Sequence, residues 1–545
     1  IFRIASQSKA ITATAIMTLV DQGMISLTDD VNQYLDEFQL ESIDGTIVTF
    51  EHLLTHTGGL DDKVYFPTAV ESATDYISLP DTFISSPPVR YDPSGIQTRY
   101  SNQGYVLLGY LIEQISGMSF EAYVQQNVFI PLGMSSSTFE QQLPQNLQQN
   151  LVARYDFDDD TFIEEPFIYV NEMPAGGMFT TASDMANFMI MNLNNGVLDD
   201  EQILRADLVT AMHDQQFTNH ESLGGYGYGF WRSEHNGLTM IMHDGSGPAV
   251  SSRMVLLPDE NVGVFFAHHG GGAGFRAQVM ARLLDEYFGL PQQPVENLSG
   301  TAEQVAGLYK NNRYVHDGYF RIPTMITLEY NIRTDNGRLY LEDGLLAGES
   351  EYVEVSTGVF QQIDLPSNQL VFHFDDNGRV SQLNANLYHT PLDFEPVAWY
   401  ESNPFLLASL IVPFLICLVA TITMPVASVI RAFRHVEYSQ LEILAHWLGW
   451  SFAVSGLFIM GLFVIGDLSP LPYASPHTSP MTVYGILTIA NLVVILALVI
   501  IVFWCLAISG QYWGLTGRIG YTILTIGSIA YLWFSIQNSL IGYNL

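Results

Sequence analysis

The stretch Ile4-Ala5-Ser6-Gln7-Ser8-Lys9 runs directly into an apolar segment, Ala10–Val20. The apolar run predicts a helix, and Ser6 and Lys9, three positions apart, lie on one face of it. A serine hydroxyl is a weak nucleophile, and a neighbouring amine that burial keeps partly neutral can remove its proton. Amides at the start of the helix can stabilise the oxyanion that forms. The pair is therefore a candidate nucleophile and base.

The same two residues also have a purely structural interpretation. Ser is a common helix N-cap and Lys a common solvated residue of the first turn, so S-x-x-K alone is a weak motif. The sequence holds only three lysines, Lys9, Lys63 and Lys310. The presence of one of them at this position favours a functional role for Lys9.

Length and composition bound the class of protein. A chain of 545 residues has room for roughly two to four domains. Its 20 Lys and Arg residues and 56 Asp and Glu residues give a formal net charge of −36. Such an acidic surface argues against binding of nucleic acid or of anionic lipid through the globular part. The two cysteines, Cys417 and Cys505, lie inside long apolar runs and say little about the redox compartment.

Residues 1–289 are expected to form an α/β (α+β) domain, in which an antiparallel sheet is flanked by helices. Helical periodicity marks Ala10–Gln22, Val106–Ser116, Phe120–Asn127 and Ala277–Phe288. Strand character marks Leu238–Met242, Ser251–Leu257 and Val262–Ala267.

Residues 290–300 read as a linker, because Gly289–Pro294 is rich in Pro and Gln. Residues 301–400 predict a small antiparallel β domain. Its signals are two Asn-Gly pairs, Asn336-Gly337 and Asn377-Gly378, each between runs of alternating polarity, which is the strongest short hairpin pattern. We find no convincing catalytic cluster there.

Residues 401–545 predict four transmembrane helices. The apolar stretches Phe405–Ile430, Leu444–Ile465, Val483–Ile508 and Ile519–Ile541 are each long enough for the ~20 residues that a span requires. Arg431 and Arg434 lie in the first connection and Arg518 in the third, whereas Gly466–Pro480 has no basic residue. The positive-inside rule then places the first and third connections in the cytoplasm, and the globular domains in an extracytoplasmic position at the cell membrane.

The four spans could instead form a transporter. Charged residues inside the membrane usually mark such pathways, and the spans hold no Asp, Glu, Lys or Arg at mid-depth. Asn491 and Gln537 can be satisfied by helix packing. The sequence therefore favours a membrane anchor or a partner-binding module.

Two further segments can complete a site with Ser6 and Lys9. Tyr100-Ser101-Asn102 leads into a predicted helix; a Tyr whose pKa a nearby cation lowers can move protons, and an Asn amide can hold a substrate carbonyl. His243-Asp244-Gly245-Ser246 lies between two predicted strands, where the Ser246 amide can join that of Ser6 as an oxyanion donor. Taken singly, these are a surface Tyr and a structural His.

The order of these motifs resembles the serine β-lactamase and penicillin-binding-protein-like hydrolases, specifically the class C β-lactamase branch with its esterase and D-amino-acid peptidase relatives. The resemblance covers nearly all of residues 1–288. The matching motifs are Phe2–Lys9, Leu53–Leu60, Tyr100–Asn102, Pro131–Met134, Ala175–Met178 and His243–Gly245.

This resemblance implies a role for each residue. Ser6 would be the acylated nucleophile, Lys9 and Tyr100 would share the proton transfers, and Asn102 would contact substrate. His243 would replace the Lys of K-T-G and Gly245 its glycine. No cofactor and no metal is implied, since the histidines have no metal-ligand spacing.

Two departures from the family pattern have consequences. Asp244 stands where Thr or Ser is usual and would repel the carboxylate of a β-lactam or peptide, which favours neutral or cationic acyl substrates. The family's fold has roughly 50 residues ahead of the serine motif, so we expect a truncated N-terminus and an uncovered sheet edge.

Three functions agree with these features of the sequence. The first is a membrane-anchored serine hydrolase that works through an acyl-enzyme on an ester or a D-amino-acid peptide or amide. The second is a catalytically weak sensor that captures a cell-wall or acyl ligand and relays its presence through the lipid bilayer. The third is a transport protein with an outer domain. The four residues Ser6, Lys9, Tyr100 and Asn102 favour the first.

Overall fold

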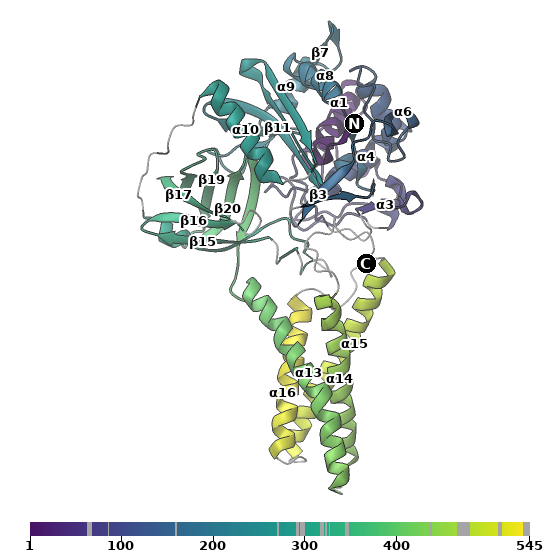
Figure 1. Cartoon of the computed structure of the whole chain (residues 1–545), viewed down its shortest axis with the longest axis vertical. Helices are drawn as coiled ribbons and strands as arrows, with labels where there is room; N and C mark the ends of the chain where they lie inside the picture. The colour runs from purple at the N-terminus through teal and green to yellow at the C-terminus, as the bar shows by residue number, and fades with distance from the viewer. Residues whose placement is uncertain are drawn as a thin grey trace. The chain divides into compact units, whose positions relative to one another are not determined.

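The computed structural model describes residues 1–62, 68–85, 87–158, 161–269, 272–289, 294, 300–316, 321, 324–325, 328–343, 348–434, 439–465, 480–510 and 515–537. Most of the predicted linker, the second predicted membrane connection and the end of the fourth predicted span lie outside these residues. The chain divides into two compact units (Figure 1): residues 1–314 with 330–396, and residues 315–329 with 397–545.

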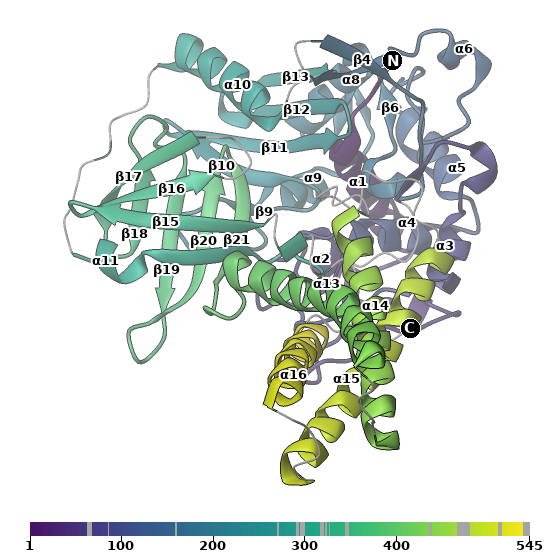
Figure 2. The same cartoon turned by 60° about the horizontal axis from the view of Figure 1, so that its bottom comes forward.

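A five-stranded antiparallel sheet lies in the first unit, with the strand order β13-β12-β11-β10-β9 (Figure 2). Side chains alternate between its two faces. On one face Met240 and Met242 of β11 pack with Met280 of helix α10 (Ala273–Phe288), and on the other Ile241 joins the main helical core. The strands are β9 (Gly225–Tyr226), β10 (Trp231–His235), β11 (Leu238–Gly247), β12 (Val250–Leu257) and β13 (Val262–His268).

Helices cover both faces of this sheet, which confirms the predicted α/β architecture. The helices are α1 (Ser8–Asp21), α2 (Phe50–Leu54), α3 (Leu79–Ser85), α4 (Asn102–Ser116), α5 (Phe120–Val124), α6 (Gln145–Gln148), α7 (Met173–Gly176), α8 (Ala182–Leu193), α9 (Ala206–His213) and α10 (Ala273–Phe288). Four two-stranded ribbons complete this part: β1 (Phe2–Arg3) with β6 (Phe179–Thr180), β2 (Ala69–Val70) with β5 (Tyr169–Val170), β3 (Arg154–Asp158) with β4 (Thr161–Glu165), and β7 (Val197–Leu198) with β8 (Glu201–Gln202).

Helices α1 and α4 position the candidate site. The first twelve residues of α1, Ser8–Leu19, are all buried, so no face of this part of the helix meets solvent. Helix α4 begins at Asn102, four residues before the predicted start, because the Ser101 hydroxyl caps it by accepting from the Gly104 amide at 3.2 Å. Gly117, with φ of +69°, ends the helix.

The predicted small β domain is a closed antiparallel barrel of eight strands. Both residues of the Asn336-Gly337 turn have positive φ, as the tight turn between β15 and β16 requires. The short helix α11 (Ala302–Val305) precedes the barrel. The strands are β14 (Gly307–Asn311), β15 (Glu329–Asp335), β16 (Arg338–Asp343), β17 (Gly348–Ser356), β18 (Val359–Gln362), β19 (Gln369–Phe374), β20 (Val380–Leu387) and β21 (Thr390–Pro396).

Four helices follow the barrel in sequence: α13 (Asn403–Phe433), α14 (Gln440–Ile465), α15 (Pro480–Gly510) and α16 (Leu515–Gln537). Among the described residues, three stretches are long and apolar enough to cross a membrane, and they are Asn403–Phe433, Gln440–Phe458 and Gly517–Ile536. The described apolar part of α15, Asn491–Leu506, is shorter. Candidate membrane helices therefore lie where the sequence predicts them.

Candidate active site

Ser6 lies in a short 3-10 turn, Ala5–Gln7, just before α1. Ala5 has φ of +48°, a left-handed conformation that is uncommon for a residue with a Cβ atom. The turn is fixed by Ser8, whose hydroxyl donates to the Ala5 carbonyl at 2.6 Å and accepts from the Met178 amide at 3.1 Å. Ser6 is not the N-cap of α1, since that position is Gln7. The structural interpretation of Ser6 as a cap is therefore wrong.

Lys9 is completely buried, so the alternative of a solvated lysine is also wrong. Its Nζ donates to three acceptors: Ser6 Oγ at 3.2 Å, Asn102 Oδ1 at 2.8 Å and the Ala175 carbonyl at 2.8 Å. Burial lowers the pKa of Lys9 to about 7, although Glu172 acts in the opposite direction. An amine with this pKa can accept a proton near neutral pH, as a general base must.

Tyr100 lies beside the same two residues. Its phenol forms a hydrogen bond with the Ser6 side chain, and Lys9 Nζ is 4.9 Å from the centre of its ring. Burial raises the pKa of Tyr100 above its ordinary value and outweighs the cation of Arg313, which acts to lower it. The prediction of a Tyr with a lowered pKa is therefore wrong, because desolvation is the larger effect. Tyr100 is a protonated phenol at neutral pH.

Asn102, the first residue of α4, joins Lys9 to a carboxyl group that the sequence did not single out. Its Oδ1 accepts from Lys9, and its Nδ2 donates to Glu172 Oε2 at 3.2 Å. Gln103 Nε2 donates to Glu172 Oε1 at 3.1 Å. Glu172 is buried, and burial first and Asp62 second raise its pKa above the ordinary value, whereas Lys9 acts to lower it. Lys9 and Glu172 are thus linked, since the charge of each shifts the pKa of the other.

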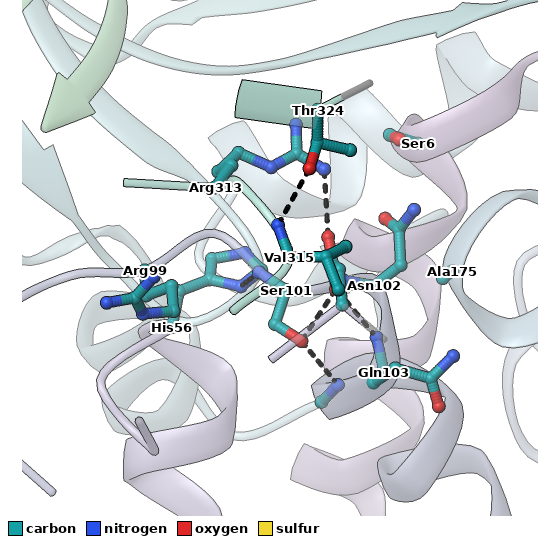
Figure 3. A network of polar contacts seen from close by, with 12 residues as sticks. Ser6, His56, Arg99, Ser101, Asn102, Gln103, Ala175, Arg313, Val315 and Thr324 are labelled. Atoms are coloured by element: carbon teal, nitrogen blue, oxygen red, sulfur yellow. Dashed lines mark hydrogen bonds and ion pairs between the residues drawn. The ribbon is translucent and has the colours of Figure 1, made fainter. Parts of the chain in front are cut away.

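A second carboxylate, Asp62, organises the start of α4, whose residues Asn102 and Gln103 are shown with Ser101 in Figure 3. The Oδ1 atom of Asp62 accepts from the Ser101 hydroxyl at 2.9 Å and from the Asn102 amide at 2.7 Å, and its Oδ2 accepts from Arg313 Nη2 at 3.0 Å. An acceptor at a helix N-terminus satisfies amides that have no partner within the helix. His56 adds a further contact, because its Nδ1 accepts from the Ser101 amide at 3.1 Å and its ring stacks on Tyr100 at 4.3 Å.

His243 is buried on β11, with its ring stacked on Trp231 at 4.6 Å between ring centres. Burial and the neighbouring charge of Lys9 lower the pKa of His243 to about 3. A neutral imidazole at physiological pH does not supply the charge that the Lys of K-T-G would provide.

The structure corrects the expectation for Asp244. Its carboxylate accepts two hydrogen bonds from Arg253, at 2.7 and 2.6 Å, and Arg276 Nε lies 3.2 Å from Oδ2. Although burial raises the pKa of Asp244, these two guanidiniums hold it below the ordinary value. Strand alternation directs Asp244 to the opposite face of β11 from His243. The two guanidiniums offset the negative charge of Asp244 and so weaken the repulsion that it would exert on a substrate carboxylate.

Gly245 allows the nucleophile turn to approach the edge of β11. A Cβ atom at this position would lie 1.9 Å from the Ile4 carbonyl oxygen, so only glycine fits. The same carbonyl accepts from the Ser252 hydroxyl at 2.8 Å, and the Ser246 hydroxyl accepts from Arg276 Nη1 at 2.8 Å. The turn that carries Ser6 therefore packs against β11, and the oxyanion hole of the Ser6 and Ser246 amides stays a prediction.

Serine, lysine, tyrosine and asparagine thus converge from two segments of the chain, Ser6–Lys9 and Tyr100–Asn102. Among the residues that the structure describes, no three His, Cys, Asp or Glu side chains gather so that they could hold a metal ion. The arrangement supports proton transfer from Ser6 to Lys9 and attack by the serine oxygen on a carbonyl carbon.

The family model described as Beta-lactamase matches residues 1–287. The chain belongs to the Beta-lactamase family. "Penicillin-binding protein 4*" of Bacillus subtilis (strain 168) is 25% identical over 358 residues, which are 63% of this chain and 76% of that protein. "Protein flp" of Staphylococcus aureus (strain N315) is 24% identical over 271 residues, and the match spans only about half of its length, 51%.

Among solved structures, that of SurE has a TM-score of 0.51 at 19% sequence identity and covers 73% of this chain and 87% of that chain. The match extends beyond the family domain, and at this identity it concerns the fold alone. The match to the Beta-lactamase model confirms the expected family of β-lactamase and penicillin-binding-protein-like proteins. Membership of the class C branch stays a prediction.

Sequence reasoning missed Glu172, Asp62, Gln103 and Arg313. Glu172 lies three positions before the Ala175–Met178 motif, and Asp62 lies two positions after the Leu53–Leu60 motif. Both are therefore close to stretches that carried the resemblance, and this proximity was the available signal. Arg313 lies outside the family domain, and no local pattern marks it.

Proposed function

We propose that this chain is a membrane-anchored serine hydrolase that transfers the acyl group of an ester, or of a D-amino-acid peptide or amide, first to Ser6 and then to water. The observation that carries the proposal is the buried Lys9, whose Nζ lies 3.2 Å from Ser6 Oγ and whose pKa is lowered to about 7. Burial of a lysine costs free energy, so this position calls for a role beyond packing.

In the proposed acylation step, neutral Lys9 takes the proton from Ser6 Oγ while the oxygen attacks the carbonyl carbon. The carbonyl oxygen becomes an oxyanion, which the amides of Ser6 and Ser246 would stabilise. When the tetrahedral intermediate collapses, the bond to the leaving group breaks and that group needs a proton. Tyr100 can donate its own proton and regain one from Lys9, because it contacts both residues.

In deacylation, a water molecule attacks the ester carbonyl of the acyl-enzyme, and its proton passes to Lys9. Collapse of the second intermediate returns a proton to Ser6 Oγ and releases the acid. The three hydrogen bonds of Lys9 fix the amine at the point where each of these transfers begins or ends.

The proposed substrate class follows from the family and from the electrostatics of the site. The Bacillus subtilis relative is named as a penicillin-binding protein. The pairing of Asp244 with Arg253 and Arg276 offsets its charge, which supports the inclusion of carboxylate-bearing substrates such as penicillins. We therefore extend the proposal to acyl donors that carry a carboxylate.

The proposed location is the membrane, with the hydrolase domain outside the cytoplasm. Support comes from the apolar helices at the C-terminal end and from Arg431, Arg434 and Arg518, which the positive-inside rule assigns to the cytoplasmic side.

Intact-mass spectrometry of the full-length protein tests the function. The protein is exposed to a fluorophosphonate and, separately, to a penicillin, with Ser6→Ala as the matched control. We expect an adduct on Ser6 with the first reagent, none in the control, and turnover of a p-nitrophenyl ester. A long-lived penicillin adduct without ester turnover would favour the sensor function. Absence of any adduct on Ser6 in folded protein would contradict both functions.

A further inference from the structure

The barrel holds the two residues that precede Tyr100. Asn312, next to strand β14, donates through Nδ2 to the Thr98 carbonyl at 2.8 Å, and its own carbonyl accepts from the Arg99 guanidinium. The Thr98 hydroxyl donates to the carboxylate of Asp393 on β21. All of these groups are buried. The approach to Tyr100 is therefore fixed by side chains and backbone that lie beyond the family domain, which ends at residue 287.

Arg313, the next residue, reaches the candidate site itself. Its guanidinium carbon lies 4.5 Å from the centre of the Tyr100 ring, and its Nη2 donates to Asp62 Oδ2 at 3.0 Å. Asp62 in turn accepts from Ser101 and Asn102. One guanidinium thus contacts the ring of Tyr100 and the carboxylate that organises the two residues after it.

We propose that the barrel is a working part of the active site, and that Arg313 is the positioning residue through which it orients the Tyr100-Ser101-Asn102 segment and sets the charge balance around Lys9. This inference rests on the proposed function. It assigns the barrel a role in the reaction that is separate from anchoring and from ligand capture.

The chemistry of arginine suits this role. A planar guanidinium can stack on an aromatic ring and at the same time donate to a carboxylate, whereas a lysine ammonium offers no planar fork. The side chain is about one third exposed, at 32%, and its partner Asp62 at 12%, so the ion pair lies at the edge of the buried site. There it is less screened than a surface pair.

The charge of Arg313 also acts on Lys9. The ionisable groups that face Lys9 are the carboxyls of Glu172 and Asp62, the guanidinium of Arg313, the phenols of Tyr100 and Tyr105, and the imidazoles of His56 and His243. Among them, Arg313 lowers the pKa of Lys9, whereas Glu172 and Asp62 raise it. Removal of the Arg313 charge should therefore raise the pH at which Lys9 becomes a base.

The test uses full-length Arg313→Gln and Arg313→Lys proteins. The control is Arg333→Gln, which removes an exposed barrel arginine paired with Glu342 and Glu349. Hydrolysis of a neutral p-nitrophenyl ester is followed across the pH range, and kcat and KM are separated. We expect Arg313→Gln to lower kcat by about 10- to 100-fold, as misplacement of a reacting group does, with little change in KM. We also expect the acid limb of its pH–rate profile, the range in which kcat rises as Lys9 loses its proton, to move to higher pH.

The second variant separates charge from shape. Arg313→Lys keeps the charge, so its acid limb should stay at the parent pH while kcat remains below that of the parent. Asp62→Asn should move the limb in the opposite direction, to lower pH, because it removes a negative charge. Arg333→Gln should behave like the parent in both respects.

The inference is overturned if folded Arg313→Gln keeps the parent kcat and pH profile. It is also overturned if kcat falls while the acid limb stays in place, because a purely structural role of Arg313 would give that result. Should Arg313→Gln not fold, a parent-like kcat in Arg313→Lys overturns it. Covalent labelling of Ser6 in the parent protein is measured in parallel, so failure of the proposed function is distinguished from failure of this inference.

Discussion

Replacement of Lys9 by arginine separates its charge from its ability to act as a base. With its pKa at about 7, about three quarters of Lys9 is neutral at about pH 7.5. Arginine has an ordinary pKa of about 12.5, so its neutral fraction at that pH is about 10⁻⁵. Even strong burial leaves a guanidinium protonated: the pKa of the buried Arg3 is lowered only to about 9.

These values set the expected magnitude. A guanidinium with a pKa of about 9, like that of Arg3, would be neutral in about 3% of molecules at about pH 7.5, which lowers the available base about 25-fold. A general base contributes about 10²- to 10⁴-fold to the rate, and this contribution sets the upper limit for the fall in acylation rate. We therefore expect acylation of Lys9→Arg to slow by at least about 25-fold. In the parent, acylation should rise with pH through about 7, because only the deprotonated amine acts as the base.

The assay is the rate of fluorophosphonate labelling of Ser6, together with p-nitrophenyl ester hydrolysis and thermal unfolding. Lys310→Arg is the matched control, because it makes the same substitution at another buried lysine, which is 3% exposed and lies in the barrel. It should label at the parent rate. A folded Lys9→Arg protein that acylates as fast as the parent would refute the assignment of Lys9 as the base.

Three further results are expected. Glu172→Gln should move the acid limb of ester hydrolysis to lower pH, because Glu172 raises the pKa of Lys9; a limb that stays in place would mean that the two groups do not interact. Asp244→Asn should lower the free energy of unfolding by about 3–5 kcal/mol, because it leaves two buried guanidiniums without their carboxylate. The control Arg333→Gln, at an exposed ion pair, should lower it by less than about 1 kcal/mol. Equal losses for the two variants in urea titrations would contradict this prediction. A cysteine at Ser475, in the predicted external connection and outside the described residues, should react with an impermeant maleimide from outside, and labelling only from the cytoplasmic side would reverse the topology.

Several parts of the fold follow directly from local sequence. The Asn336-Gly337 pair needs positive φ at both positions and fixes the hairpin of β15 and β16. The apolar run after Lys9 forms a helix buried on every side, which explains how a lysine in its first turn is kept from water. The closure of the barrel is not local, since it depends on β14 pairing with β21, far along the chain.

The site divides in the same way. Ser6 and Lys9 could be predicted together because they lie only three positions apart in the sequence. Glu172 and Asp62 are far from them in sequence, and the fold brings both carboxyls to the site, where each contacts Asn102. The sign of the Tyr100 pKa shift was also missed, because it depends on how much solvent the fold removes from the phenol.

The charge of the site is thus redistributed relative to the K-T-G pattern. His243 is neutral at physiological pH, and the carboxylate of Asp244 is held by guanidiniums on the other face of β11. The guanidinium that contacts the ring of Tyr100 is that of Arg313, which lies beyond the family domain. Since this cation and Glu172 act on Lys9 in opposite directions, the pH at which Lys9 becomes a base is set jointly by the hydrolase domain and the barrel. A change in the barrel can therefore alter the pH dependence of the reaction without touching Ser6.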